Sequence, residues 1–389
     1  MRAAVLPPRW PVPSARPRRQ PRWVSRVAAT LLPLAVGCRP TSSRAARAPA
    51  SPSVTRWLVL APHPDDEVLI AGGVLARAAS EGAPLRVVVM TNGDDDCVHD
   101  GLTRERESLD GLAQLGVDAG RVSFLGYPDG ALARLGRAPL ATRRRMGGRC
   151  VEGYSTYGAH GQGGAEYHLV RFGGHAKYTR GAVVSDLATL LAEFRPTDVV
   201  TTHPLDTHPD HAATYALLRA AIERLAFAPR VHRAMVHNGD CWPIGVAPRE
   251  PCPALPALPA DATPPLPGRL LGYAPRERRL VPPSCASSDV SRNAKVRAIG
   301  AHRSQTRGLA TSYLFGFARR DEVFFPETLE RRGRRWLRRG SAVDDAVAPA
   351  TLALRSGEAQ ALDHAPPLVV DAELPRGATA VSLEGDQGG

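Results

Sequence analysis

Two short segments of the sequence concentrate imidazole and carboxylate side chains. The first is HPDDE at residues 63–67, and the second is HPLDTHPDH at residues 203–211. Histidine and carboxylate without thiolate suit Zn²⁺ or another borderline divalent metal, and catalytic zinc takes three protein ligands and leaves a position for water. Further polar groups beside the ligands are what a hydrolase needs, because water must lose a proton and the tetrahedral intermediate must be stabilised. The two segments therefore predict a hydrolytic metal site.

The spacing within each segment allows two side chains to reach one ion. His63 and Asp66 are three residues apart, where a strand ends and a helix begins. His208 and His211 are also three apart, so that one could bind the ion while the other faces the substrate. Capping of the following helix would explain one or two carboxylates of the first segment, but not three beside a histidine.

Both segments follow predicted strands of an α/β fold. Apolar runs alternate with helical periodicity from residue 57 onward, which is typical of a parallel sheet with crossover helices. We expect strands at 57–62, 85–91, 121–125, 198–202 and 231–237, and helices at 67–81, 103–115, 181–194, 210–226 and 294–306. Ligands of such sheets bind beyond the carboxyl ends of the strands. The expected fold is a Rossmann-like three-layer α/β sandwich with a mostly parallel sheet and the metal site at the C-terminal ends of the strands.

The rest of the chain divides by composition into a leader, a domain and a tail. Basic residues precede the apolar run Val27–Gly37, which is typical of a secretory signal and too short for a transmembrane helix. The sequence AVGC ending at Cys38 resembles a bacterial lipobox, and a plain signal peptide cut nearby is the alternative. We therefore expect an exported protein, either a membrane-anchored lipoprotein or a periplasmic or extracellular protein. The expected segments are a signal peptide at 1–38, a tether at 39–55, a catalytic domain at 56–328 with an insert at 137–180 and a Pro-rich excursion at 242–286, and an extension of unknown role at 329–389.

The net charge of +12 does not indicate a nucleic-acid partner. Ten of the 50 basic residues are arginines within the first 50 positions, which contain no acidic residue. The remaining chain has 40 basic and 38 acidic side chains, without a basic face interleaved with aromatics. Membrane contact is accordingly expected only through the lipid anchor.

Export would place the cysteines in an oxidising compartment. Five remain beside the lipobox cysteine, enough for two disulfides and one thiol, although the sequence cannot fix their connectivity. The plausible pairs are Cys97 with Cys150, and Cys241 with Cys252 or Cys285.

At the two metal-site segments the sequence resembles the PIG-L/LmbE-like deacetylases of N-acetylglucosamine derivatives. The marks of that family are an AHPDDE-type motif after the first strand and an HPDH motif late in the domain; here they read PHPDDE and HPDH. Three further matches are Arg104 and Glu107 before LGV, FLGYPDG around Asp129, and KVRAIGAHRSQ at 295–305. The resemblance covers residues 57–327, and five short motifs in the family's order make it specific.

The resemblance implies a zinc-dependent deacetylase, with Fe²⁺ or another divalent metal as the alternative cofactor. His63, Asp66 and His211 match the metal ligands of the family. Asp65 matches the general base that activates water at the metal.

The resemblance also assigns residues that act on the substrate. His208 is expected to stabilise the oxyanion or to protonate the leaving amine, with Asp210 positioned to orient it. Arg104 and Asp129 match positions that hold the sugar. The mycothiol branch of the family has a tyrosine two residues before His208, where this chain has Asp206, which argues against a mycothiol substrate.

The expected function is removal of the acetyl group from an N-acetylglucosamine-type amino sugar or glycoconjugate, releasing acetate and a free amine. One alternative is an amidase or deacylase of another N-acyl compound, such as an antibiotic glycoside. A second is a non-catalytic surface lipoprotein that binds glycans or metal, although such a protein would not need a base beside its ligands. A nicotinamide-dependent oxidoreductase is disfavoured, because no G-x-G-x-x-G turn follows the first strand.

Several other residues have two interpretations at this stage. His203 either supports the metal site or is structural. The acidic run Asp94–Asp96 is either a solvated loop or lines the crevice. Lys295 and His302 share one face of a predicted helix, and they either reach the site or serve packing alone.

Overall fold

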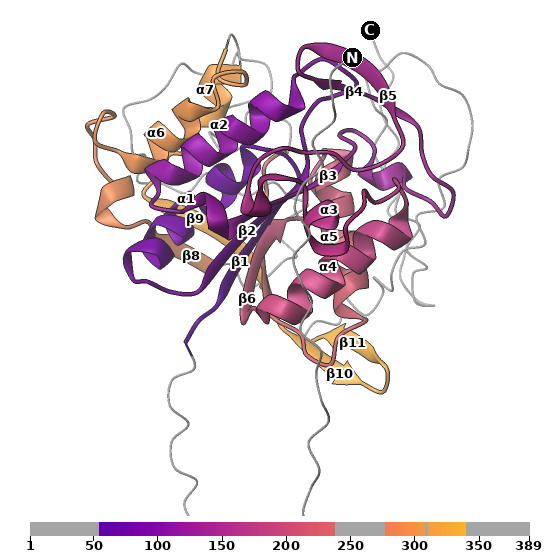
Figure 1. The fold of residues 1–389 in the computed structure, drawn as a ribbon. Helices are drawn as coiled ribbons and strands as arrows, with labels where there is room; N and C mark the ends of the chain where they lie inside the picture. Colours follow the sequence, from indigo (N-terminus) through magenta and orange to yellow (C-terminus); the bar gives the residue numbers. More distant parts are fainter. Residues whose placement is uncertain (1–53, 238–276, 308–309, 340–389) are drawn as a thin grey trace, which may run out of the picture. The chain divides into compact units, whose positions relative to one another are not determined.

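The computed structural model describes residues 54–237, 277–307 and 310–339, and its centre is a seven-stranded sheet (Figure 1). The order of the strands is β3-β2-β1-β6-β7-β9-β8. They comprise β1 (Trp57–Ala61), β2 (Leu85–Thr91), β3 (Val122–Tyr127), β6 (Asp198–Thr202), β7 (Arg230–Ala234), β8 (Glu277–Leu280) and β9 (Asp321–Glu327). The five strands from β3 to β7 pair in parallel, and β9 runs antiparallel to both of its neighbours. The mostly parallel sheet is thereby confirmed.

Helices cover both faces of the sheet and give the predicted three layers (Figure 1). One face carries α1 (Asp66–Ser80), α2 (Gly101–Gln114), α6 (Ala294–Ala301) and α7 (Ala310–Phe315). The other carries α3 (Tyr167–Phe172), α4 (Arg180–Phe194) and α5 (Pro209–Ile222). Short 3₁₀ turns lie at Ala119–Arg121, Leu132–Arg134, Gln162–Gly164 and Pro283–Cys285.

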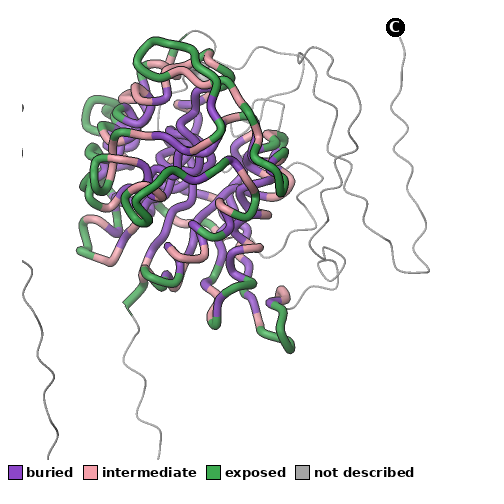
Figure 2. The backbone as a smooth tube through the Cα atoms, turned by 45° about the vertical axis from the view of Figure 1, so that its right-hand side comes forward, coloured by how far each residue is buried: buried purple, intermediate pink, exposed green. Residues whose placement is uncertain are grey.

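The core lies in two halves, one on each side of the sheet. Along β1, Leu58 and Leu60 pack with the α4 and α5 side, whereas Trp57 and Val59 pack with the α1 side. A strand covered on both faces must be apolar at every position, which is why the sequence shows continuous rather than alternating apolar runs. In Figure 2 the strands and the inner faces of the helices are buried, and exposed segments surround them.

Helix α1 has a break that a distant ion pair fills. Its backbone leaves the helical region at Ala71 (φ −138°, ψ 15°). The side chain of Lys295 donates to the Leu69 carbonyl (3.0 Å), which a regular helix would pair with the Gly73 N–H. The carboxylate of Glu322 accepts the Gly73 N–H instead (2.7 Å), and it pairs with Lys295 (2.6 Å). A buried salt bridge thus replaces part of the hydrogen-bond ladder and fixes the course of the helix.

The glycines of α1 make room for this arrangement. A Cβ at Gly72 would lie 3.1 Å from the Lys295 side chain, and one at Gly73 would lie 2.6 Å from Val281. Lys295 therefore serves packing rather than the metal site.

Two hairpins lie outside the main sheet. The predicted insert contains β4 (Thr142–Met146) and β5 (Arg149–Gly153). At the other end of the chain, β10 (Leu329–Arg332) pairs with β11 (Arg335–Arg338). Trp336 of this second hairpin is buried, and its backbone and ring N–H groups donate to Glu223 and to the Leu225 carbonyl. Residues 329–338, expected as the start of a separate extension, therefore pack against the domain.

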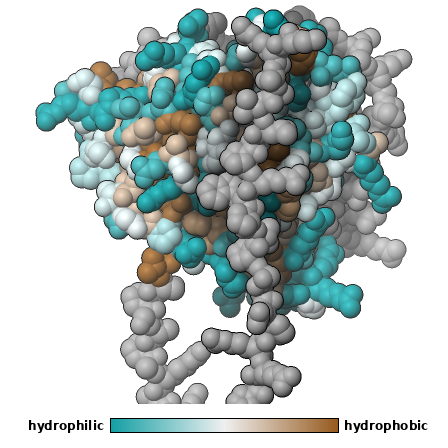
Figure 3. Space-filling model, in the orientation of Figure 1, coloured by the Kyte–Doolittle hydropathy of each residue, from teal (hydrophilic) through white to brown (hydrophobic). Residues whose placement is uncertain are grey.

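Some predictions fall wholly or largely outside the described residues. These are the signal peptide with Cys38, the tether, most of the Pro-rich excursion, Cys241 and Cys252, and most of the C-terminal extension. The disulfide between Cys97 and Cys150 is confirmed, whereas Cys285 is a buried free thiol. Among the helices described, none combines the length and apolar character needed to cross a membrane. On the face drawn in Figure 3, hydrophilic and hydrophobic side chains are interspersed.

Candidate metal centre

The two chemistry-bearing segments meet at one edge of the sheet, as predicted. β1 and β6 are hydrogen-bonded neighbours, and the chain leaves β1 toward β2 on one side and β6 toward β7 on the other. Such a switch point opens a crevice at the carboxyl ends of the strands. Residues 63–67 follow β1 and residues 203–211 follow β6, so the histidines and carboxylates of both loops meet at this edge of the sheet.

The three predicted metal ligands form a nearly equilateral triangle. The distance from His63 Nδ1 to Asp66 Oδ2 is 3.2 Å, from Asp66 Oδ2 to His211 Nε2 is 3.2 Å, and from His211 Nε2 to His63 Nδ1 is 3.2 Å. Ligand atoms bonded at about 2.0–2.2 Å to a tetrahedral zinc ion lie roughly 3.3–3.6 Å apart. The three buried side chains therefore fit one Zn²⁺ with almost no rearrangement.

Each histidine of this triangle has a carboxylate beside its other ring nitrogen. His63 Nε2 lies 2.9 Å from Asp129 Oδ1, and His211 Nδ1 lies 3.3 Å from Asp206 Oδ2. Metal-binding histidines are commonly oriented in this way, because a carboxylate holds the proton on the far nitrogen and makes the near nitrogen a better ligand. The surroundings of the triangle thus match a metal site as well as its distances do.

Asp129 lies differently from the sugar contact expected from the sequence. One carboxylate oxygen faces His63, and the other accepts the backbone N–H of Asp95 (3.1 Å). The structure therefore places Asp129 as a support of the metal ligand, and its contact with a substrate stays a prediction.

His208 lies beside the triangle, but its ring is not hydrogen-bonded in the way expected of a metal ligand. Its nitrogen is within 4.8 Å of those of His63 and His211. However, its Nδ1 accepts the backbone N–H of Asp210 (3.3 Å), so the proton of the neutral ring is on Nε2. Burial and the neighbouring histidines hold the pKa of His208 well below its usual value, which keeps the ring neutral. The Nε2–H of His208 is thus available as a hydrogen-bond donor.

Asp210 contacts the His208 ring through its backbone N–H (3.3 Å) and not through its carboxylate. That carboxylate accepts the N–H groups of Gly130 (2.8 Å) and Leu132 (2.9 Å), and it lies 3.4 Å from His63 Nε2. Asp210 instead fixes the loop after β3 against the metal site.

Asp65 is held in a strained and buried position. Its backbone has φ 129° and ψ −34°, a region that L-residues rarely adopt, and its N–H donates to Glu67 Oε2 (2.9 Å). Such conformations cost about 1–3 kcal/mol and persist where surrounding contacts enforce them. Burial raises the pKa of Asp65 to about 6, although the nearby charge of Arg104 lowers it. The carboxylate is thus basic enough to take up a proton near neutral pH.

The Arg104 side chain is hydrogen-bonded to Asp65 and to nearby backbone carbonyls. Its side chain is buried and donates to the carbonyls of Gly93 (2.8 Å) and Pro64 (2.7 Å) and to the Asp65 carboxylate (3.1 Å). The contact of Arg104 with sugar therefore stays a prediction.

Two residues of this site had no role assigned from the sequence. His237 follows β7, and its ring lies 4.8 Å from that of His211 and 5.4 Å from that of His208. Asp206 accepts the N–H groups of Val236 and His237 and thereby ties the two strand ends together. A lone histidine carries no motif, and the only signal was its position just beyond a strand next to β6.

The undecided residues mostly have structural roles. His203 Nδ1 accepts the Leu205 N–H within the turn after β6, and the His302 ring is buried 3.8 Å from Glu67. In the acidic run, Asp94 is buried and accepts the Tyr157 hydroxyl (2.7 Å). The run is therefore not simply a solvated loop.

Comparisons with known proteins find similar sequences among deacetylases. Residues 58–222 match the family described as GlcNAc-PI de-N-acetylase (PIG-L). A 1D-myo-inositol 2-acetamido-2-deoxy-alpha-D-glucopyranoside deacetylase of Saccharomonospora viridis is 34% identical over 168 residues, which are 42% of this chain and 56% of the relative. The corresponding deacetylase of Rhodococcus erythropolis is 28% identical over 274 residues, 65% of this chain and 82% of the relative. Among solved structures, the zinc-inhibited form of the teicoplanin deacetylase Orf2 is 19% identical with a TM-score of 0.41, covering 70% of this chain and 97% of that one.

The chain thus spans little more than half of the first of these relatives. The matched segment begins in β1 and ends in α5, so it includes both loops of the triangle. Over residues 58–222 the chain is therefore similar to the PIG-L family.

Proposed function

We propose that this protein is a metal-dependent hydrolase that removes the acetyl group from an N-acetylated amino sugar or glycoconjugate. The observation that carries the proposal is the 3.2 Å triangle of His63, Asp66 and His211, with a raised-pKa carboxylate and a neutral imidazole beside it. The family match and the names of the relatives supply the substrate class, an N-acetylglucosamine derivative.

The triangle would hold the metal, for which we propose Zn²⁺. A bound zinc ion would supply Lewis-acid chemistry, polarising the amide carbonyl and making water more acidic. The protein contributes the two outer carboxylates, Asp129 and Asp206, which keep both ligand histidines in the required tautomer.

Asp65 is the proposed general base. Its carboxylate is ionised above pH 6, and Arg104 holds it in place at 3.1 Å. It would take the proton from the attacking water and pass it to the nitrogen of the leaving amine, as a base of matched pKa does. The bond between the carbonyl carbon and nitrogen breaks, and acetate and the free amino sugar leave.

His208 is the proposed oxyanion donor. Its Nδ1 is occupied by the Asp210 N–H, so the Nε2–H is the group available to a substrate oxygen. A fixed neutral donor stabilises the charge that develops on the carbonyl oxygen in the transition state.

The test is amine release by the full chain from a panel of N-acetylated sugars, with and without chelator and with zinc restored. Release that disappears with chelator and returns with zinc supports the proposal. Metal-loaded protein that releases no amine from any acetylated sugar, yet hydrolyses longer acyl amides, would move the activity to another N-acyl class. Protein that neither binds zinc nor releases amine would refute the enzyme altogether.

We further propose that the protein works in an oxidising compartment after export. The disulfide between Cys97 and Cys150 supports this, because such bonds rarely persist in a reducing cytosol. Fractionation of the source cells with thiol labelling tests it; protein found in the cytosol with both thiols reduced would contradict it.

A further inference from the structure

The hairpin β4–β5 is exposed and rich in arginine. It carries Arg143, Arg144, Arg145 and Arg149, and its two large apolar residues, Met146 and Val151, are each 37% exposed. No residue of the hairpin belongs to either half of the described core. Apolar burial therefore does not hold this hairpin in place.

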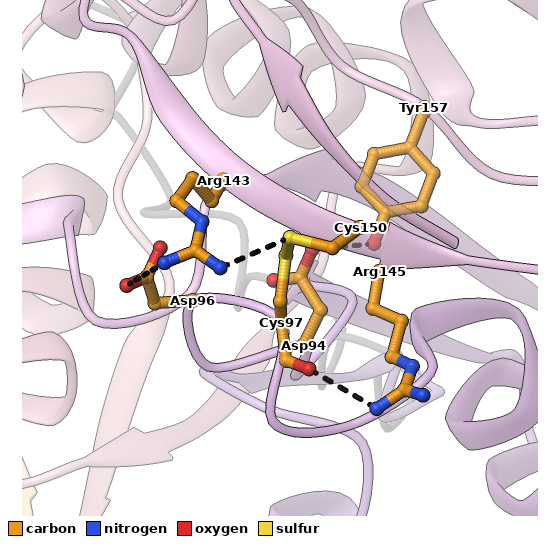
Figure 4. The surroundings of a disulfide bond; sticks show 7 residues. All are labelled: Asp94, Asp96, Cys97, Arg143, Arg145, Cys150 and Tyr157. Carbon is orange, nitrogen blue, oxygen red and sulfur yellow. Dashed lines mark hydrogen bonds and ion pairs between the residues drawn. A yellow bond between two sulfur atoms is a disulfide. The ribbon is translucent and has the colours of Figure 1, made fainter. Parts of the chain in front are cut away.

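Specific contacts hold the hairpin against the loop after β2 (Figure 4). The disulfide joins Cys150 of β5 to Cys97, and Arg145 donates to the Cys97 carbonyl (3.4 Å). Arg143 lies 3.7 Å from the Asp96 carboxylate. At the tip, the Gly148 N–H donates to Asp100, the residue that caps α2 (2.7 Å).

The tip of the hairpin is a tight turn that needs glycine. Gly147 and Gly148 have φ values of 60° and 78°, the left-handed conformation of a two-residue hairpin turn. The hairpin is thus held by specific contacts and not by a core, which suggests that its shape matters for the space next to it.

An open pocket of about 590 Å³ lies between the hairpin tip and α2. Its lining includes Thr103, Arg106, Arg145, Gly147, Gly148 and His160. Among the residues the structure describes, no carboxylate lies within 4.0 Å of the guanidinium of Arg106 or Arg145. The acidic lining residue, Asp100, already accepts the N–H groups of Thr103 and Gly148.

We propose that this pocket binds an oxyanion, a phosphate or carboxylate carried by the substrate away from its reacting acetamide. Within the described part of the chain, the two guanidinium groups have no carboxylate within 4.0 Å, although the charge of Asp100 on the same lining acts on Arg106, and they offer the forked N–H donors that match such a group. The Thr103 hydroxyl adds a further donor, since its oxygen already accepts from Arg106.

The pocket and the metal centre share one loop. The N–H of Asp95 contacts Asp129 at the metal centre, whereas Cys97 and Asp100, a few residues further on, contact the hairpin, and Asp100 also lines the pocket. On α2, Arg104 contacts the base, and Arg106, two residues further on, lines the pocket on another side of the helix. That one glycoconjugate reaches both sites along the shared loop rests on the proposed function, whereas anion binding itself does not.

The first experiment measures anion binding directly by calorimetry. Chelator-treated full chain is used, so that no metal can bind the anion, with inorganic phosphate, N-acetylglucosamine 6-phosphate and N-acetylmuramic acid as probes and N-acetylglucosamine as the neutral reference. Arg106→Gln and Arg145→Gln should each weaken binding of a charged probe at least about tenfold, the loss expected for one charge-assisted hydrogen bond. Arg149→Gln, on the same hairpin but outside the pocket, is the matched control and should bind as the parent does. Equal loss in all three variants, or no binding of any charged probe, would overturn the proposal.

The disulfide gives a second, independent arm. The double variant Cys97→Ser/Cys150→Ser releases the hairpin from the loop after β2 and keeps both arginines. It should weaken anion binding as Arg145→Gln does, and circular dichroism should show unchanged secondary structure. Unchanged anion binding would show that the position of the hairpin does not shape the pocket.

A third arm separates this proposal from the proposed function. With zinc restored, the two pocket variants should raise KM for the phosphate- or carboxylate-bearing sugar and leave the neutral sugar unaffected. Tighter binding or a lower KM for the phosphate-bearing or the carboxylate-bearing sugar identifies which anionic group the pocket binds. If the parent protein bound the anions through Arg106 and Arg145 but deacetylated nothing, the proposed function would fail while the binding site stood.

Discussion

Asp129 offers the sharpest test of the site, because the sequence and the structure assign it different roles. Its carboxylate lies 2.9 Å from His63 Nε2 and its second oxygen accepts one backbone N–H. A hydrogen bond to a charged group contributes about 1.5–3 kcal/mol, against about 0.5–1.5 kcal/mol for a neutral one. Asp129→Asn keeps an oxygen and loses the charge, so zinc affinity should fall by about 1 kcal/mol, roughly fivefold. Asp129→Ala loses the whole contact and should weaken zinc binding roughly 10- to 100-fold.

The assay is competition for zinc between metal-free protein and a chromophoric chelator at fixed pH, with KM for an acetylated sugar measured in parallel. Asp118→Asn is the control, because this carboxylate is exposed and distant in the chain from both loops of the site. Graded loss of zinc affinity from Asn to Ala, with the control unchanged, would support the structural role. If Asp129→Ala bound zinc as tightly as the parent and raised KM alone, Asp129 would face the sugar and our reasoning would be wrong.

Three further predictions concern the base, the break in α1 and a buried acid. Asp65→Asn should lower kcat by roughly 10²- to 10⁴-fold with zinc still bound; near-parental turnover would remove Asp65 as the base. Lys295→Met leaves the buried Glu322 unpaired and should lower the free energy of unfolding by about 3–5 kcal/mol, whereas Lys295→Met/Glu322→Gln should recover part of it; denaturant unfolding measures both, and equal stability of Lys295→Met and the parent would contradict the role of the pair. Burial raises the pKa of Glu105 from 4.5 to about 8, so its stabilisation is complete below pH 4.5 and is lost as pH rises through 8. Glu105→Gln should therefore flatten the fall in unfolding free energy between pH 5 and 8, and an unchanged slope would show that another group causes it.

The sequence was sufficient for the elements that position the site. Periodicity placed β2 at 85–91 and α4 within one residue of its start, because buried parallel strands and crossover helices leave strong apolar patterns. β9 has no such pattern, because its sequence DEVFFPE has charged residues at both ends. These ends are nevertheless buried, since the strand pairs antiparallel with β7 and β8.

The composition of the site was also predictable, but not the direction of each side chain. Motif positions identified Arg104, Asp129 and Asp210, yet each of these carboxylate or guanidinium groups turns toward another protein group. Such directions depend on helix phase and on loops that meet only in the folded chain. His237 shows the opposite case, a residue with no motif that the sheet order brings beside His211.

The filled break in α1 also bears on the order in which the protein folds. The partners of Leu69 and Gly73 are Lys295 and Glu322, which are 226 and 249 residues away in the chain. Contacts of such long sequence separation form late, because the loop between them must close first. The helix that begins with Asp66 therefore cannot take its final course until the chain beyond Glu322 has left the ribosome. A nascent chain that ends before Glu322 should hold both metal-site motifs and still lack the final course of the helix that carries Asp66.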